Sequence, residues 1–213
     1  YILVYVSNRI IKIIDNNNII GINLCEIRIT ENLINDIQTL KSFLYECYCA
    51  IFIFNITDTE SFQKLKELIN SINKIDHDEN PIIPLTKIVI SNHLDLDSIR
   101  QVSSFEINDF LNLNKEIVNF NISLKTGENY QELLACLINT LNNVDKNNNI
   151  DELPCNIVQE EKIRSAKSNN LINIKTTISC ILIGDSEVGK SSFLHRYFFN
   201  KFSEHFFNTV GID

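Results

Sequence analysis

The sequence predicts an α/β fold in which helices cover both faces of a mostly parallel, six-stranded sheet. Two observations support this class. Short apolar runs alternate along the chain with segments whose apolar residues recur at helical spacing. Several of these runs are continuously apolar, as expected for parallel strands buried on both faces. With 213 residues, of which 44% are hydrophobic and 22% charged, the chain can bury one sizeable core.

The first half of the chain begins with a predicted hairpin. Residues 2–14 and 19–28 have the partial alternation of strands, and the turn-forming segment 15–18 between them favours an antiparallel pair. The continuous apolar run at 49–54 predicts a buried parallel strand. In residues 62–72 the apolar side chains return every three or four positions, which predicts a helix.

The second half continues the alternation of strands and helices. Further strands are predicted at 87–90, 117–122 and 178–183. Further helices are predicted at 99–111, 130–141 and 191–198. The segment 142–177 is polar and broken by Pro154, so we expect a linker there.

A phosphate-binding pattern follows the last predicted strand. Residues 184–192 fit G-x-x-x-x-G-K-[ST], with an apolar strand before the pattern and a helix after it. The backbone N–H groups of such a loop surround phosphates, and the helix turns its positive end toward the anion. Lys190 would neutralise the terminal phosphates, and the Ser191 hydroxyl would hold Mg²⁺. The candidate phosphate-binding residues are Gly184, Asp185, Ser186, Glu187, Val188, Gly189, Lys190, Ser191 and Ser192.

Composition excludes several classes of function. The net charge of −8 argues against a nucleic-acid-binding surface, and the sequence has neither a membrane-span-length apolar run nor a signal-peptide pattern. The six cysteines lack metal-type spacing, as expected of buried side chains in a reducing cytosol. We therefore expect a cytoplasmic protein that binds no nucleic acid. Because the sequence contains no methionine, we also expect it to be cut from a longer protein.

The segment beyond the phosphate loop resembles the small GTPases of the Ras superfamily. Its last five residues, Thr-Val-Gly-Ile-Asp at 209–213, are most similar to the Rab branch. The resemblance implies that Thr209 reaches Mg²⁺ and the γ-phosphate, and that Phe202 packs on the guanine. Residues 57–62, Thr-Asp-Thr-Glu-Ser-Phe, are similar to a T-D-x-x-S-F signature that is common in Rab proteins.

Two further segments resemble the guanine-binding motifs of this superfamily. Residues 91–95, Ser-Asn-His-Leu-Asp, are similar to N-K-x-D with His93 at the lysine position. Asp95 would accept from the ring N–H and exocyclic amine of guanine, a pattern that adenine lacks, while Asn92 would brace the loop. Residues 123–125, Ser-Leu-Lys, resemble S-A-K, which adds Ser123 and Lys125 to the guanine site.

The hydrolytic D-T-A-G-Q switch of the superfamily is missing. Our alignment puts residues 29–33, Ile-Thr-Glu-Asn-Leu, at this motif, and they keep none of its aspartate, glycine and glutamine. Asp15, Glu31 or Asp36 could replace the aspartate only by moving, which metal geometry disfavours. We therefore assign no catalytic residue and expect impaired or absent hydrolysis.

The resemblance covers nearly the whole chain, in permuted order. Residues 1–145 match the body of a degenerate small GTPase that lacks its first strand and phosphate loop, 146–177 form the linker, and 178–213 match the opening of a Rab-like GTPase, as in a tandem protein cut at both ends. We expect 178–183 to insert between 19–28 and 49–54, giving a P-loop GTPase fold with circularly permuted strand order. Insertion into a second copy of the chain is the alternative.

The resemblance implies a guanine-nucleotide switch in vesicle trafficking that uses GTP/GDP and Mg²⁺. Its partners would be protein effectors and exchange factors, and it would reach the cytosolic face of membranes only through a lipid anchor outside this chain. A pseudo-GTPase interaction module is the alternative. The lost switch and His93 favour that alternative. The carboxylate of Glu187 beside the phosphate loop would repel anions, but we discount it because this loop position varies within the family.

Overall fold

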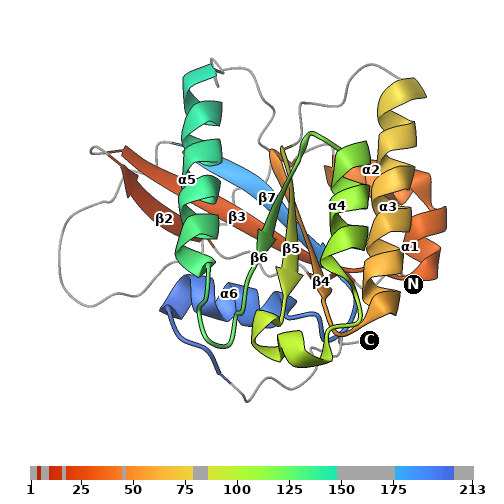
Figure 1. Cartoon of the computed structure of the whole chain (residues 1–213). Coiled ribbons are helices and arrows are strands. Elements are labelled where there is room, and N and C mark those ends of the chain that lie inside the picture. The colour runs from red at the N-terminus through yellow and green to blue at the C-terminus, as the bar shows by residue number, and fades with distance from the viewer. Residues whose placement is uncertain are drawn as a thin grey trace.

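The computed structural model describes residues 4–5, 10–15, 18–44, 47–78, 86–147 and 176–203. Its sheet has seven strands in the order β1, β3, β7, β4, β5, β6, with β2 also paired to β3 (Figure 1). The strands are β1 (Val4–Tyr5), β2 (Ile10–Asp15), β3 (Asn18–Arg28), β4 (Cys49–Asn55), β5 (Thr86–Asn92), β6 (Ile117–Asn121) and β7 (Thr176–Gly184). The helices are α1 (Glu31–Asn35), α2 (Ile37–Leu44), α3 (Thr59–Asp78), the 3-10 helix η1 (Leu94–Ile99), α4 (Ser104–Leu113), α5 (Tyr130–Asn147) and α6 (Lys190–Phe199).

Strand β7 lies in the middle of the sheet, although it is the last strand in the sequence. It runs parallel to β3 on one side, from the pair Ile20 and Thr176 to the pair Arg28 and Gly184. On its other side it runs parallel to β4, where Gly184 is opposite Ile53. Both neighbours of β7 therefore come from the first quarter of the chain, and the phosphate loop starts where these three strands end.

Two layers of helices cover the sheet and bury separate cores. Helices α1 to α4 pack on one face, through residues such as Leu33, Phe62 and Phe110. Helices α5 and α6 pack on the other face, where Tyr130 and Phe193 are almost fully buried (Figure 1). Strands β4 and β5 are buried on both faces between these layers, which explains the apolar run of β4 and the apolar centre of β5 at residues 88–90.

Two of the expected elements differ from the structure. The expected strand 2–14 appears in the described residues as two segments, β1 and β2, both antiparallel to β3, so the sheet has seven strands and not six. The helix expected from residue 99 begins at Ser104. Its start is fixed by a capping box, in which Glu106 N donates to Ser103 Oγ at 3.2 Å and Ser103 N donates to Glu106 Oε2 at 3.0 Å.

Helices α1 and α2 are additions that the sequence analysis did not predict. Thr30 caps α1, because its Oγ1 accepts from Leu33 N at 3.2 Å. Asp36 caps α2 in the same way, with Oδ1 accepting from Thr39 N at 3.1 Å. Helix α1 overlaps residues 29–33, which were aligned with the switch motif, and α2 follows it in the sequence.

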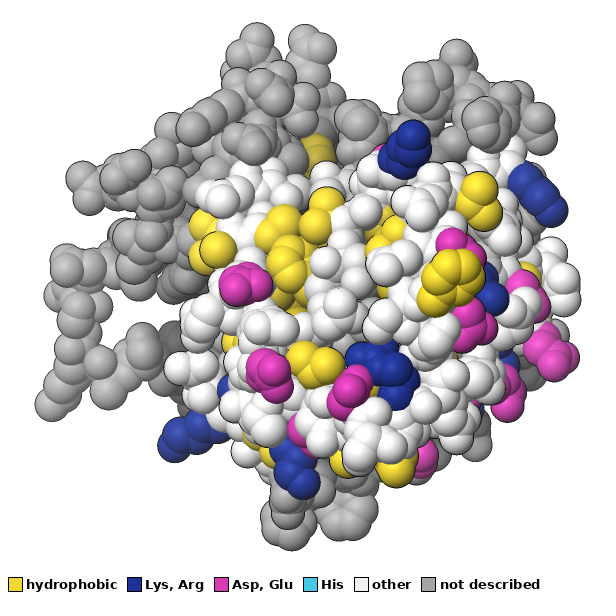
Figure 2. All heavy atoms as spheres, viewed as in Figure 1, with side chains coloured by type: hydrophobic (Ala, Val, Ile, Leu, Met, Phe, Trp, Pro, Cys, Tyr) yellow, Lys and Arg dark blue, Asp and Glu magenta, His cyan; other side chains and the backbone are white. Residues whose placement is uncertain are grey.

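The two elements beside the expected linker extend into it. Helix α5 continues to Asn147 and β7 begins at Thr176, while residues 148–175 lie outside the described residues. None of the described helices combines the length and apolar character that a membrane span requires. On the face shown in Figure 2, lysine and arginine side chains are interspersed with aspartate and glutamate.

Candidate nucleotide-binding site

The phosphate loop contains two positions that require glycine. Gly189 has φ +105°, and a Cβ there would lie 2.4 Å from Asn92 Nδ2. A Cβ on Gly184 would lie 2.5 Å from the Ile53 carbonyl oxygen and 2.8 Å from a Val188 methyl carbon. Any larger residue would therefore push the loop away from β4 and from the end of β5.

Lys190 begins α6 and is bound inside the phosphate loop. Its Nζ donates to the carbonyl oxygens of Gly184 at 3.0 Å and Asp185 at 2.6 Å, and the residue is only 8% exposed. Burial lowers the pKa of the Lys190 ammonium, while the nearby carboxylates of Glu26 and Asp185 act in the opposite direction. The amine thus lies inside the loop, held by two of its carbonyl oxygens.

The side chain of Asn92 hydrogen-bonds both the phosphate loop and the loop that carries Ser123. Its Nδ2 donates to the Val188 carbonyl at 2.9 Å, and its Oδ1 accepts from Leu124 N at 3.1 Å. The residue is 2% exposed at the end of β5. One buried amide therefore connects segments that are 96 and 32 positions away in the sequence.

Asp95 and Ser123 lie together at the same edge of the sheet. Ser123 Oγ donates to Asp95 Oδ1 at 2.5 Å and also accepts from Thr126 N at 3.0 Å. Asp95 remains exposed, so its carboxylate can also meet a ligand. The side chain of Lys125 is exposed too, while its carbonyl accepts from Arg196 Nη2 at 2.8 Å. Helix α6 therefore helps to hold this loop.

His93 adopts a conformation that is unusual for a residue with a side chain. Its φ of 71° lies in the left-handed region, and it precedes η1. Burial lowers the pKa of the imidazole, and Nδ1 is buried without a hydrogen-bond partner among the described residues. A neutral ring thus occupies the position that carries lysine in the N-K-x-D motif.

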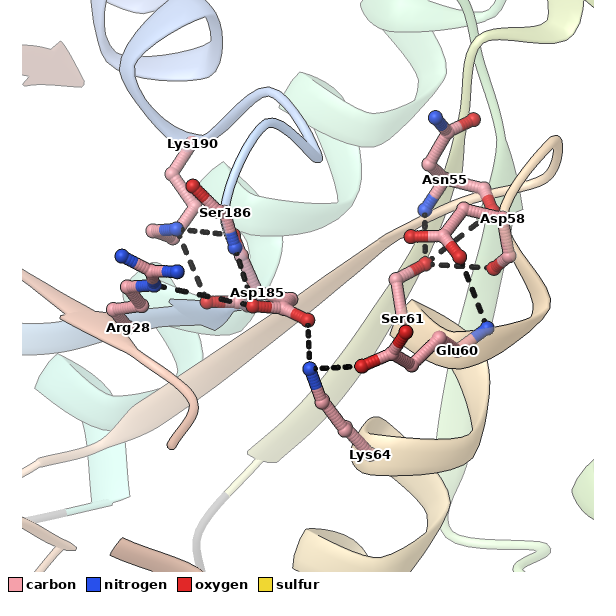
Figure 3. A network of polar contacts seen from close by, with 10 residues as sticks. Arg28, Asn55, Asp58, Glu60, Ser61, Lys64, Asp185, Ser186 and Lys190 are labelled. Carbon is pink, nitrogen blue, oxygen red and sulfur yellow. Dashed lines mark hydrogen bonds and ion pairs between the residues drawn. The ribbon is translucent and has the colours of Figure 1, made fainter. Parts of the chain in front are cut away.

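Asp185 is held by two cations at the edge of the phosphate loop (Figure 3). Lys64 of α3 donates to Asp185 Oδ2 at 2.8 Å and contacts Glu60 at 2.6 Å, whereas Arg28 of β3 lies 3.9 Å from Asp185 Oδ1. These two carboxylates raise the pKa of the Lys64 ammonium, so it stays charged. Asp185 Oδ1 also accepts from Ser186 N at 2.6 Å, which fixes the first turn of the loop.

Glu26 on β3 is a site residue that the sequence analysis missed. It is 6% exposed, and its Oε1 accepts from Ser191 Oγ at 3.4 Å. Burial raises the pKa of this carboxyl group, while the charge of Lys190 and the hydrogen bond from Ser191 oppose the shift. The available signal was a carboxylate within a strand that is otherwise mainly apolar.

The remaining predicted residues are less closely connected to this arrangement. Glu187 is exposed with φ 61°, and Ser192 is half-buried on α6. Phe202 follows α6 and is half-buried, while Thr209 lies outside the described residues. Within the described ranges, no group of three or more His, Cys, Asp and Glu side chains could hold a metal ion. Protein ligands alone therefore do not form a closed metal site there.

Comparisons with known proteins point to one family of proteins. A sequence model described as the Ras family matches residues 35–143 and, separately, residues 179–213. The Ras-related protein Rab-32D of Dictyostelium discoideum is 49% identical over 45 residues, which are 20% of this chain and 20% of that protein. The Ras-related protein Rab-27B of Homo sapiens is 56% identical over 36 residues, which are 17% of this chain and 16% of that protein. Each of these alignments thus covers a fifth or less of the relative.

Proposed function

Because the chain belongs to the Ras family, we propose that it binds GDP and GTP with Mg²⁺ at one site formed by both ends of the chain. The phosphate subsite is the loop 184–192, and the base subsite consists of Asn92, Asp95, Ser123, Lys125 and Phe202. In this proposal the domain is circularly permuted, with β7 as the strand that residues 1–145 lack. The parent protein acts as a Rab-like switch in vesicle trafficking, with effectors and exchange factors as partners.

One observation carries this proposal. The Asn92 amide hydrogen-bonds the phosphate loop at Val188 and the Ser123 loop at Leu124, so the two subsites have a fixed relative position. A nucleotide needs such a fixed spacing because its phosphates and base are bound at the same time. The exposed carboxylate of Asp95 lies at the base end, and the buried amine of Lys190 lies at the phosphate end.

The residues present fit the phosphates better than they fit hydrolysis. The glycine conformations, the Lys190 amine and the N-terminus of α6 suit a bound anion. Mg²⁺ would be held by Ser191, and by Thr209 in the proposal, and it would neutralise phosphate charge. Residues 29–35 contain no glutamine that could orient a water molecule. Ile29 is buried, and α1 begins at Glu31. We therefore propose nucleotide binding without efficient turnover.

A pseudo-GTPase interaction module is the second candidate, and Glu187 favours it. This carboxylate is exposed on the phosphate loop, in a left-handed conformation that is costly for a residue with a Cβ. Its negative charge would oppose phosphate binding. In that case the fold would serve partner binding alone.

Titration with fluorescent GDP in the presence of Mg²⁺ separates the two candidates. We expect binding that resists competition by ATP and is lost in Lys190→Ala and Asp95→Ala. The matched controls Lys115→Ala and Asp109→Ala change exposed residues away from the site and should bind like the wild type. Circular dichroism of each variant verifies folding. Absence of binding to the wild-type chain would overturn the proposal and favour the interaction module.

A further inference from the structure

We propose that Glu26 replaces the missing switch aspartate and holds Mg²⁺ at the phosphate loop together with Ser191. The inference rests on the proposed function, because the nucleotide phosphates must bring the metal and complete its coordination. It concerns a residue of β3 that lies outside every motif used to identify the family.

The position of Glu26 brings a carboxylate under the start of α6. Glu26 is paired in register with Leu182 of β7, two residues before the phosphate loop begins. Its Oε1 lies 3.4 Å from Ser191 Oγ, although 165 positions separate the two residues in the sequence. A carboxylate and a hydroxyl are both hard oxygen ligands of the kind that Mg²⁺ binds.

The alignment pointed to a position that cannot supply this carboxylate. Ile29, aligned with the aspartate, is 2% exposed and packs in the core beneath α1 to α4. Glu31 is exposed on α1, and Asp36 binds Thr39 of its own helix. Both of these candidates weighed from the sequence are exposed, and the side chain of the third, Asp15, lies outside the described residues.

Asp185, the first carboxylate of the phosphate loop, is already paired with cations. Asp185 binds Lys64 at 2.8 Å and lies 3.9 Å from Arg28, so two cations compensate its charge. Glu26, by contrast, receives one long hydrogen bond from Ser191, and the described contacts include no hydrogen bond to it from Lys190. Its oxygens therefore retain lone pairs that can accept a metal ion or a metal-bound water.

The electrostatics of the site also favour a cation at Glu26. A buried carboxylate is costly unless a positive charge lies nearby, and Lys190 is the neighbouring cation. Bound phosphates compete with Glu26 for the charge of Lys190. A divalent cation between Ser191, Glu26 and the phosphates would compensate both anionic groups, which makes metal and nucleotide binding mutually favourable.

The test compares fluorescent-GDP affinity in millimolar Mg²⁺ and in EDTA. We expect the wild type to lose tenfold or more of its affinity in EDTA. In Glu26→Gln this ratio should shrink toward one, while the EDTA affinity stays close to that of the wild type. The matched control Glu132→Gln, an exposed residue of α5, should keep the wild-type ratio. Titration of Mn²⁺ into the GDP-loaded protein, followed by electron paramagnetic resonance, should show a metal affinity that is weaker by about 10–100-fold in Glu26→Gln.

The outcomes distinguish failure of this inference from failure of the proposed function. If Glu26→Gln weakens GDP binding equally with and without Mg²⁺, Glu26 is only a counter-ion of Lys190 and the inference is wrong. If the wild type binds no GDP in either condition, the proposed function fails and the inference fails with it. Should Glu26→Gln not fold, Glu26→Asp provides the same comparison: an intermediate Mg²⁺ ratio supports the metal role, and an unchanged ratio contradicts it.

Discussion

Replacement of Asn92 by alanine tests whether the two ends of the chain form one unit. The substitution removes the hydrogen bond from Nδ2 to Val188 O and the one from Leu124 N to Oδ1. At 2% exposure, Asn92 shields both backbone groups from water, so each is left buried without this partner. Each unsatisfied buried polar group costs about 1–3 kcal/mol, so for the two groups we expect a loss of about 2–6 kcal/mol in the free energy of unfolding.

Urea unfolding of the nucleotide-free chain, followed by far-ultraviolet circular dichroism, measures this loss. Asn112→Ala is the matched control, because Asn112 is exposed on α4 and its substitution should change stability by less than about 0.5 kcal/mol. The slope of the transition should stay the same in both variants if they unfold in one step. We also expect Asn92→Ala to weaken fluorescent-GDP binding, since the phosphate loop loses its brace.

A small effect would refute the reasoning. If Asn92→Ala costs no more than Asn112→Ala, the phosphate loop is not docked on the end of β5. The pairing of β7 with β3 and β4 within one chain would then be in question as well, because the same docking places Gly189 against Asn92. A swapped dimer would explain an intermediate result only if the stability rose with protein concentration.

Three further predictions concern single side chains. Glu187→Gly should tighten GDP binding about fivefold in a fluorescence titration, because it removes a repulsion of about 1 kcal/mol between the carboxylate and the phosphates. Glu187→Gln should achieve most of this gain, and no gain would show that the carboxylate points away from the phosphates. Tyr130→Phe should raise the free energy of unfolding, measured by urea denaturation, by about 1 kcal/mol, because Tyr130 Oη is buried without a hydrogen-bond partner among the described residues. A loss of stability would contradict this and would reveal a water molecule bound to Oη. Burial, with a smaller contribution from Cys180, raises the pKa of Tyr197 from 10.0 to about 12, so the folded state loses stability as the pH rises from 10 to 12. Tyr197→Phe should lessen this loss in unfolding measured between these two pH values, and a pH profile identical to that of the wild type would contradict the prediction.

The sequence by itself determined the features that depend on local pattern. The continuous apolar runs predicted β4 and β5, and the glycines and lysine of 184–192 predicted a loop between a strand and a helix. These predictions succeed because neighbours in the sequence decide the hydrophobic period and the backbone conformation. Helices α1 and α2 were not predicted, although Thr30 and Asp36 carried capping signals.

Only the tertiary structure decided which distant residues meet. Glu26 lies beside Ser191 because β7 is paired with β3 in one register, and a shift by one residue would turn Glu26 to the opposite face of the sheet. Asn92 meets Val188 because β7 lies next to β4, which in turn pairs with β5. Strand order and register arise from packing across the whole sheet, and no local pattern encodes them. The sequence could therefore name the phosphate loop, while the structure was needed to find the carboxylate beneath it.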